Sequence, residues 1–335
     1  MANLRAGLIG LGMMGRHHAR VLDSLEGVDL VAVADPGGDR FGAAPSYPVL
    51  RSVEELISCG LDYCMVAVPT GSHEEVALAL ASAGVHALVE KPLSHDVDSA
   101  TRIAEAFETE NLVGGVGHIE RYNASLQQAR MRVENGDLGE IFQISTRRQG
   151  PFPGRIADVG VVKDLGTHDI DITSWISGQE YKAVSSQTVH KSGRDHEDLV
   201  AILGSMSRGA VTSHLVNWLS PLKERTIAIT GERGTFVADT LTADLTYFAN
   251  GKVQTMWDEI SRFRGVSEGD VVRYAFPKPE PLRVEHENFR DAILGKQNDI
   301  VSFRRGLKTV QVAEAVLESA NQGVTVSIQS PPHVG

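Results

Sequence analysis

Cysteine is scarce in this chain, whose 335 residues include only Cys59 and Cys64. Cys64 lies in the apolar run 63–68, where a buried and inert thiol is expected. The sequence therefore predicts neither a disulfide framework nor a metal site.

Long apolar runs are also missing. No run approaches the roughly 20 residues that a helix needs to cross a bilayer. A predicted strand begins almost at the N-terminus, where a signal peptide would need its apolar segment and cleavage site. We therefore expect a cytoplasmic protein with no membrane partner.

Positively charged residues are fewer than negatively charged ones. The chain has 32 Lys and Arg residues and 43 Asp and Glu residues, which gives a net charge of −11. This balance argues against a general role on nucleic acids or membrane surfaces. It does not exclude an anionic small substrate, since a local arginine cluster can bind phosphate inside an acidic protein.

What the sequence does contain is a glycine-rich motif within residues 4–35, which read as strand, turn, helix and second strand. Gly10 permits a tight turn, Gly12 lets the backbone approach a pyrophosphate at a helix N-terminus, and Gly15 allows close helix–strand packing. Asp35 can accept hydrogen bonds from a ribose and repel a 2′-phosphate, which favours NAD over NADP. A chance glycine turn is the alternative, and the register of strands, helix and acid argues against it. The predicted cofactor contacts are Gly10, Leu11, Gly12, Met13, Met14, Gly15 and Asp35.

The first part of the chain alternates between strands and helices. We expect strands at 5–10, 29–34, 62–68, 86–90 and 112–117, and helices near 14–25, 53–58, 73–83 and 96–109. Parallel strands need such crossover connections, so this alternation predicts a parallel sheet with helices on both faces.

From about residue 139 the pattern changes to period-two alternation, as at 226–230 and 243–247. The predicted fold is α/β: an N-terminal Rossmann doubly wound parallel sheet, followed by a C-terminal α+β domain with an open, mainly antiparallel sheet. We expect domains at 1–119 and 120–303, with a helix and strand at 304–328 whose helix packs toward the first domain. One face of the open sheet needs a cover, which favours a homodimer or homotetramer through that sheet; a solvated polar face is the alternative.

The strand at 86–90 runs straight into the tripeptide Glu90-Lys91-Pro92. Ligands of open parallel sheets bind outside the carboxyl ends of the strands, so Lys91 should project toward the nicotinamide. An ammonium there can stabilise an alkoxide that forms on a substrate. A surface lysine at a strand end is the alternative.

Asp164 and His168 are four residues apart at the start of an apolar helical segment. If the helix has begun there, the two side chains share a face and reach one pocket. Such a pair suits proton transfer at neutral pH, with histidine as the acid–base. The alternative is a capping aspartate beside a helix histidine. Asp169 and Asp171 are expected to cap the helix or hold His168.

Together these motifs resemble the Gfo/Idh/MocA oxidoreductase family of glucose–fructose oxidoreductase, inositol dehydrogenase and related sugar dehydrogenases. The resemblance covers nearly the whole chain and rests on 10–15 with His18, on 69–73, on 83–86 with 90–92, and on Asp164 with His168. It implies a Rossmann domain, an open-sheet substrate domain and a cis Lys91–Pro92 bond. It also implies Lys91, Asp164 and His168 as the catalytic set, and Val68, Pro69, Thr70, His73, Glu90 and Lys91 along the cofactor.

The substrate is predicted from the segments 117–123, 147–153 and 155–161. Glu120 departs from the paired arginines that inositol dehydrogenases tend to carry. The three segments look more like nucleotide-sugar members that oxidise C3 of UDP-N-acetylglucosamine, because arginine forks pair with phosphate oxygens. The predicted substrate residues are Lys91, Glu120, Arg121, Tyr122, Asn123, Arg148, Arg155, Asp164 and His168.

Other readings of the sequence stay open. The arginines could be solvated strand and loop charges. The enzyme could act on myo-inositol or a free sugar, or it could be an NAD-dependent glycosidase. A non-catalytic regulator that senses a sugar or NAD is a further alternative, although such proteins can lose the lysine or histidine that this chain keeps.

Overall fold

The structure is a computed structural model that describes residues 2–154, 159–251, 253–254 and 267–328. The chain forms two compact units, Met1–Ile119 with Glu280–Glu314, and Glu120–Pro279 with Ala315–Gly335. The first boundary lies where the sequence predicts it. The sequence predicts that the segment 280–303 belongs to the second domain, but in the structure this segment belongs to the first unit.

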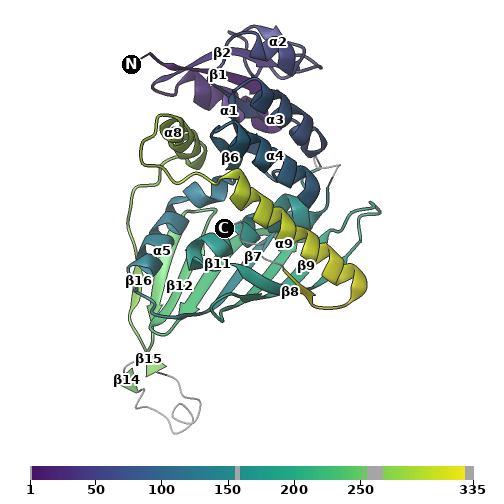
Figure 1. Ribbon diagram of the computed structural model, residues 1–335. Coiled ribbons are helices and arrows are strands. Elements are labelled where there is room, and N and C mark those ends of the chain that lie inside the picture. Colours follow the sequence, from purple (N-terminus) through teal and green to yellow (C-terminus); the bar gives the residue numbers. More distant parts are fainter. Residues whose placement is uncertain (1, 155–158, 252, 255–266, 329–335) are drawn as a thin grey trace. The chain divides into compact units, whose positions relative to one another are not determined.

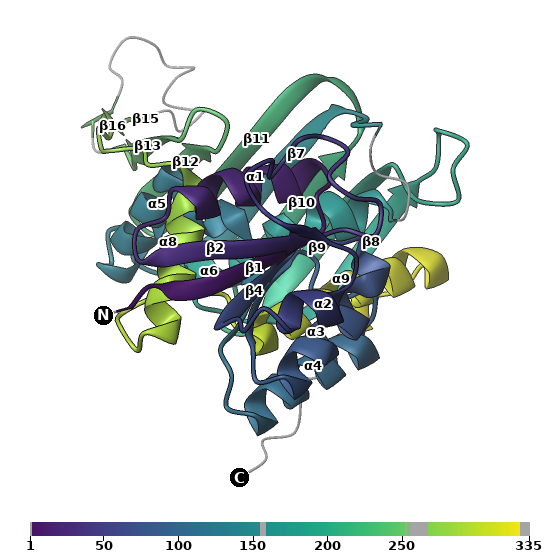
Figure 2. The ribbon, with the colours of Figure 1, turned by 90° about the horizontal axis from the view of Figure 1, so that it is seen from above.

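The first unit contains a six-stranded parallel sheet in the order β3-β2-β1-β4-β5-β6. Figure 2 shows β2, β1 and β4 side by side, where the strand order reverses. The strands are β1 (Leu4–Ile9), β2 (Val28–Ala34), β3 (Val49–Leu50), β4 (Tyr63–Val66), β5 (His86–Glu90) and β6 (Gly114–Gly117). The helices are α1 (Met13–Asp23), α2 (Val53–Ile57), the short η1 (Thr70–Ser72), α3 (His73–Ser82), α4 (Val97–Thr109) and α8 (Pro281–Ile293).

Successive residues of the central strands enter two different cores. Leu8 belongs to one apolar cluster and Ile9 to the other, and Leu88 and Val89 divide in the same way. Because strand side chains alternate between faces, both faces of the sheet are covered. Burial is complete at Cys64 and raises the pKa of its thiol, as an inert cysteine requires.

The core of the first unit explains why 280–303 belongs to it. Phe289 of α8 lies in the cluster with Leu8, whereas Val301 and Phe303 lie in the cluster with Ile9. The helix α9 (Phe303–Gln322) adds Leu307 to that second cluster and then continues into the second unit. These apolar contacts join residues almost 300 positions apart, so the local pattern does not reveal them.

The second unit contains a nine-stranded sheet in the order β16-β13-β12-β11-β7-β10-β9-β8-β17 (Figure 1). Neighbours are antiparallel except β7 and β10, which are parallel. The predicted α/β fold class, with one parallel and one mainly antiparallel sheet, is confirmed. The strands are β7 (Ile141–Pro151), β8 (Tyr181–Val189), β9 (Leu199–Met206), β10 (Val211–Asn217), β11 (Leu219–Gly231), β12 (Gly234–Asp239), β13 (Asp244–Ala249), β16 (Val271–Arg273) and β17 (Val326–Ser327). A separate ribbon pairs β14 (Val253–Gln254) with β15 (Ser267–Glu268).

The described helices of the second unit pack on one face of this large sheet, its inner face. They include α5 (Ala124–Glu134), which packs on β12 and β13, and α6 (Thr167–Ser177), which packs on β7. In β7 the side chains of Ile144, Thr146 and Arg148 are buried on this inner face. None of the helices in the described ranges is long and apolar enough to cross a membrane.

Candidate active site

The glycine motif forms the turn between β1 and α1. Gly10 has φ +92°, and a Cβ at this position would lie 2.5 Å from the Ala67 carbonyl oxygen. A Cβ on Gly15 would lie 1.9 Å from the Gly10 carbonyl oxygen, so helix and turn touch there. A Cβ on Gly12, the N-cap of α1, would meet nothing within 4 Å. The open backbone at this helix N-terminus fits the pyrophosphate of a dinucleotide.

Asp35 joins the end of β2 to this turn. Its Oδ2 accepts a hydrogen bond from the Leu11 backbone N at 2.8 Å, and its Oδ1 accepts one from Gly37 N at 2.7 Å. The carboxylate thus positions the glycine turn itself, a second task beside its predicted contact with the ribose.

Two arginines that the sequence prediction overlooked flank the segment after Asp35. Arg40 donates to the Gly37 carbonyl at 3.3 Å, and Arg51 donates to the Pro36 carbonyl at 3.1 Å. Arg51 is 16 residues from Asp35, and the pairing of β2 with β3 carries it to this loop.

His73, which begins α3, joins the ends of two strands. Its Nε2 lies 3.0 Å from the Val68 carbonyl oxygen, and its Nδ1 lies 3.0 Å from that of Pro92. Burial lowers the pKa of this imidazole. The ring lies between the predicted cofactor segments 68–70 and 90–92 and contacts the backbone of both.

Lys91 follows β5, and the Lys91–Pro92 bond is cis, as the resemblance implies. Its backbone N donates to Glu90 Oε2 at 3.0 Å. The other oxygen, Oε1, lies 2.9 Å from Nε2 of the buried His18. Burial opposes ionisation of Glu90, but His18 and Lys91 hold the pKa of this carboxyl below its usual value.

The hydrogen-bonded line continues from His18 Nδ1 to Nε2 of His286 on α8, 2.9 Å away. Burial lowers the pKa of His286 well below its usual value, so this ring is neutral. Since an ionised Glu90 can only accept, His18 donates to it from Nε2. The line gives His286 a role in holding Glu90 that no local sequence pattern signals.

In the second unit, Asp164 lies in the π-helical turn η3 (Val162–Gly166) and His168 lies in the first turn of α6. The side chains of both residues are buried. Single π-helical turns are frequent at functional sites. The predicted pair therefore spans a junction between π and α helix instead of one regular α-helix.

Asp169 and Asp171 do not cap α6, and the expectation of a capping role is wrong. The N-cap of α6 is Gly166, with no side-chain capping bond. Asp171 accepts two hydrogen bonds from Arg121, at 2.7 and 2.5 Å from Nε and Nη2. Asp169 lies 3.1 Å from Arg148 Nε. Each acid therefore lies in a buried ion pair with an arginine of its own.

The predicted substrate residues Glu120, Arg121, Tyr122 and Asn123 belong to η2 (Ile119–Tyr122) and the N-cap of α5. Glu120 accepts from Arg148 Nη1 at 2.8 Å, and the positive charges of Arg148 and Arg225 keep the pKa of this carboxyl low against the effect of burial. Asn123 Oδ1 accepts from Ser125 N and so caps α5. Arg155 lies outside the described residues.

The sequence prediction also overlooked Arg225 of β11. Its Nη1 reaches Glu120 Oε1 at 3.4 Å, and the charge of Asp164 acts on its guanidinium. The only signal for Arg225 is its register opposite Arg148, which requires knowledge of the strand pairing.

Comparison with known families assigns both parts of the chain. Residues 4–118 match the model "Oxidoreductase family, NAD-binding Rossmann fold" of GFO/IDH/MocA, and residues 126–237 match the "GFO/IDH/MocA C-terminal domain". The chain belongs to the Gfo/Idh/MocA oxidoreductase family. The predicted family and the predicted cofactor, NAD, are thereby confirmed.

Curated relatives of this family carry different substrate names. UDP-N-acetylglucosamine 3-dehydrogenase of Acidithiobacillus ferrooxidans is 30% identical over 218 residues, which are 64% of this chain and 66% of that protein. Inositol 2-dehydrogenase 2 of Saccharopolyspora erythraea is 30% identical over 207 residues, 58% and 60% of the two chains. Each match spans less than two thirds of the relative's length.

Solved structures match over nearly their full length. UDP-N-acetylglucosamine 3-dehydrogenase GnnA from Acidithiobacillus ferrooxidans has a TM-score of 0.83 at 24% identity, covering 96% of this chain and 99% of that one. The WlbA dehydrogenase from Bordetella pertussis, solved with NADH and UDP-GlcNAcA, has a TM-score of 0.82 at 21% identity, covering 98% and 99%. These structural similarities show that the chain shares the fold of these two proteins.

Proposed function

We propose that this protein is an NAD-dependent dehydrogenase that oxidises C3 of a nucleotide sugar such as UDP-N-acetylglucosamine. The observation that carries the proposal is the buried Asp164–His168 pair at a π-helical turn, in a chain whose other unit is an NAD-binding Rossmann domain. An acid–base pair and a dinucleotide site are the two requirements for oxidation of an alcohol.

Each catalytic residue of the proposal has one task. His168 takes the proton of the substrate hydroxyl, and Asp164 orients the imidazole and stabilises its charged form. The Lys91 ammonium stabilises the developing alkoxide. Bound NAD supplies the acceptor for the hydride. Glu90, held by His18, positions Lys91 through its backbone N–H.

The choice of a nucleotide sugar rests on two observations. The relative named UDP-N-acetylglucosamine 3-dehydrogenase is similar both in sequence and in fold. In the second unit two arginines, Arg148 and Arg225, also contact Glu120 on the same side of the sheet as α6. Inositol oxidation is the second candidate, because Inositol 2-dehydrogenase 2 is equally identical to this chain.

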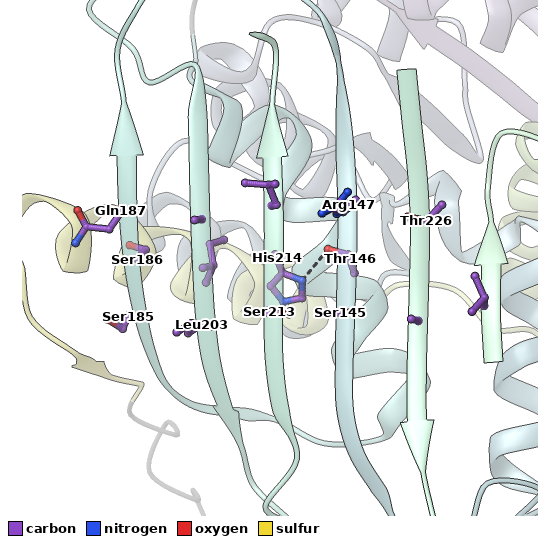
Figure 3. A pocket seen from close by; sticks show the side chains of 15 residues that line it. Ser145, Thr146, Arg147, Ser185, Ser186, Gln187, Leu203, Ser213, His214 and Thr226 are labelled. Atoms are coloured by element: carbon purple, nitrogen blue, oxygen red, sulfur yellow. Dashed lines mark hydrogen bonds between the residues drawn. The ribbon is translucent and has the colours of Figure 1, made fainter. Parts of the chain in front are cut away.

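A homodimer or homotetramer through the large sheet belongs to the same proposal. The outer face of β8, β9, β10, β7 and β11 is hollowed, and Figure 3 shows Gln187, Leu203, Ser213, Arg147 and Thr226 along it. The side chain of Leu203 is 59% exposed there. A second copy of the chain would cover this face and exclude water from Leu203.

The decisive experiment measures NADH formation from NAD with UDP-N-acetylglucosamine, its uronic acid, N-acetylglucosamine and myo-inositol. We expect fast turnover of a UDP-sugar and slow turnover of the others. Fast turnover of inositol alone would replace the proposed substrate. Glycoside cleavage without net NADH would indicate the glycosidase, and NADH binding without turnover of any sugar would indicate a regulator.

A further inference from the structure

Arg225 and Arg148 face each other on neighbouring antiparallel strands. Their Cα atoms are register partners between β11 and β7, and the next pairs in the same row are Ile227 with Thr146 and Ile229 with Ile144. Ile227 and Ile229 are buried, so Arg225 lies on the inner, helix-covered face of the sheet. Like charges directly opposite each other destabilise a strand pair unless anions balance them.

The anions on this face balance the two arginines unequally. Arg148 is 1% exposed and holds Glu120 at 2.8 Å and both oxygens of Asp169 at 3.1 Å. Arg225 reaches only Glu120 Oε1, at 3.4 Å, and that oxygen already accepts from Arg148. This long contact is the single side-chain hydrogen bond of Arg225 to any residue that the structure describes.

Arg225 is partly buried, and N–H donors that lack an acceptor in such surroundings destabilise the protein. A guanidinium carries five N–H donors, and only 25% of this side chain is exposed. Burial, together with repulsion from Arg148, lowers the pKa of Arg225 from its usual value. A partly buried cation with spare N–H groups is stabilised by an oxyanion that accepts a bidentate pair of hydrogen bonds.

Two neighbouring arginines have other partners or another orientation. Arg121 is 3% exposed and donates twice to Asp171. Arg147 points to the opposite face, where its side chain is 61% exposed. Of the two arginines that face each other on β7 and β11, Arg225 therefore has the greater remaining capacity for a ligand, and the charge of Asp164 reaches it.

We propose that Arg225 binds the diphosphate of the nucleotide-sugar substrate through its guanidinium fork. This inference rests on the proposed function and adds a specificity residue to it. Arg148 then serves to hold Glu120 and Asp169 in place, while Arg225 contacts the ligand. A neutral sugar has no oxyanion for this contact, so Arg225 would favour nucleotide sugars over free sugars and inositol.

The first test compares Arg225→Gln, Arg225→Lys and the matched control Arg273→Gln. Arg273 is an exposed cation on β16 of the same sheet, paired with Asp244. For UDP-N-acetylglucosamine we expect Arg225→Gln to raise KM about tenfold or more with kcat nearly unchanged, because one charge-assisted contact is lost. Arg225→Lys should recover part of the loss, and N-acetylglucosamine should show the same KM in all variants. An unchanged KM for the UDP-sugar in Arg225→Gln would overturn the inference and leave the proposed function intact.

The second test needs no turnover and separates the two proposals. Calorimetric titration of UDP onto the NAD-loaded protein should give binding that weakens about tenfold in Arg225→Gln and less in Arg225→Lys. UDP binding that depends on Arg225 without oxidation of UDP-N-acetylglucosamine would support the anion site and refute the proposed reaction. Glucuronate is the second ligand: if it, and not UDP, competes at Arg225, the site takes a carboxylate and the diphosphate assignment is wrong. Failure of the unaltered protein to bind UDP would also overturn it.

Discussion

At the scale of single residues, the candidate site depends on how buried charges are divided among partners. Arg121 donates hydrogen bonds to Asp171, and Arg148 donates to Asp169 and Glu120. His168, in contrast, lies buried at the start of α6. An acid–base histidine has to exchange a proton with the substrate, whereas a paired arginine only holds its neighbours. Substitution of single residues can therefore separate the role of His168 from the roles of the paired arginines.

Replacement of His168 by Ala tests the acid–base assignment. We expect kcat to fall by about 10²- to 10⁴-fold, because the hydroxyl proton loses its acceptor. Binding of NAD, measured by fluorescence titration, should stay nearly constant since the glycine motif belongs to the other unit. The control is His190→Ala, which removes an exposed histidine of the second unit. A comparable loss of turnover and NAD affinity in His168→Ala would refute the role.

At the scale of elements, the cofactor side is built from the ends of β1, β2, β4 and β5. Asp35 joins the end of β2 to the glycine turn, and His73 joins the segments that follow β4 and β5. The turn is thus held by side chains from neighbouring strands as well as by its own glycines. Such cross-links between strand ends keep a ligand site rigid.

Replacement of Asp35 by Ala tests this arrangement. We expect the affinity for NAD to fall more than that for NADP, because the ribose loses an acceptor and a 2′-phosphate loses a repelling charge. Arg40 and Arg51, which bind the loop after Asp35, would then offer cations to the phosphate. The ratio of the two dissociation constants is the measurement, and Asp39→Ala on the same loop is the control. An unchanged ratio would exclude the ribose contact.

At the scale of the whole molecule, the large sheet has helices on its inner face and a hollowed outer face. Leu203, Ser213 and Gln187 lie on that outer face (Figure 3). The buried His214, whose Nδ1 lies 2.8 Å from the Thr146 hydroxyl, links β10 to β7 behind it. Because this hydrogen bond joins β10 and β7, it stabilises the part of the sheet on which a second copy of the chain could pack.

Replacement of Leu203 by Arg tests the proposed oligomer. A charge at this exposed leucine should prevent close packing of two sheets and shift the protein toward monomers. Analytical ultracentrifugation over a range of concentrations measures this shift. Phe41→Arg, at an exposed aromatic residue of the first unit, should leave the assembly unchanged. A monomeric unaltered protein would show that the outer face is solvated.

Local patterns were sufficient wherever the determining residues lie close together in the chain. The strand and helix alternation, the glycine turn and Asp35 all fall within short segments, and each local rule has a steric or electrostatic cause. The edge strand β3 escaped prediction because two residues are too few to show a period. The helix α5 also escaped prediction.

By itself, then, the sequence determined the two-sheet α/β fold, the family and the cofactor, since backbone sterics and side-chain periodicity act over a few residues. Only the tertiary structure decided that α8 joins the first unit, that His286 supports Glu90 through His18, and that Arg225 faces Arg148. These relations join residues that lie between 72 and 281 positions apart. They follow from core packing and strand register, which depend on the whole chain and leave no trace in any local window.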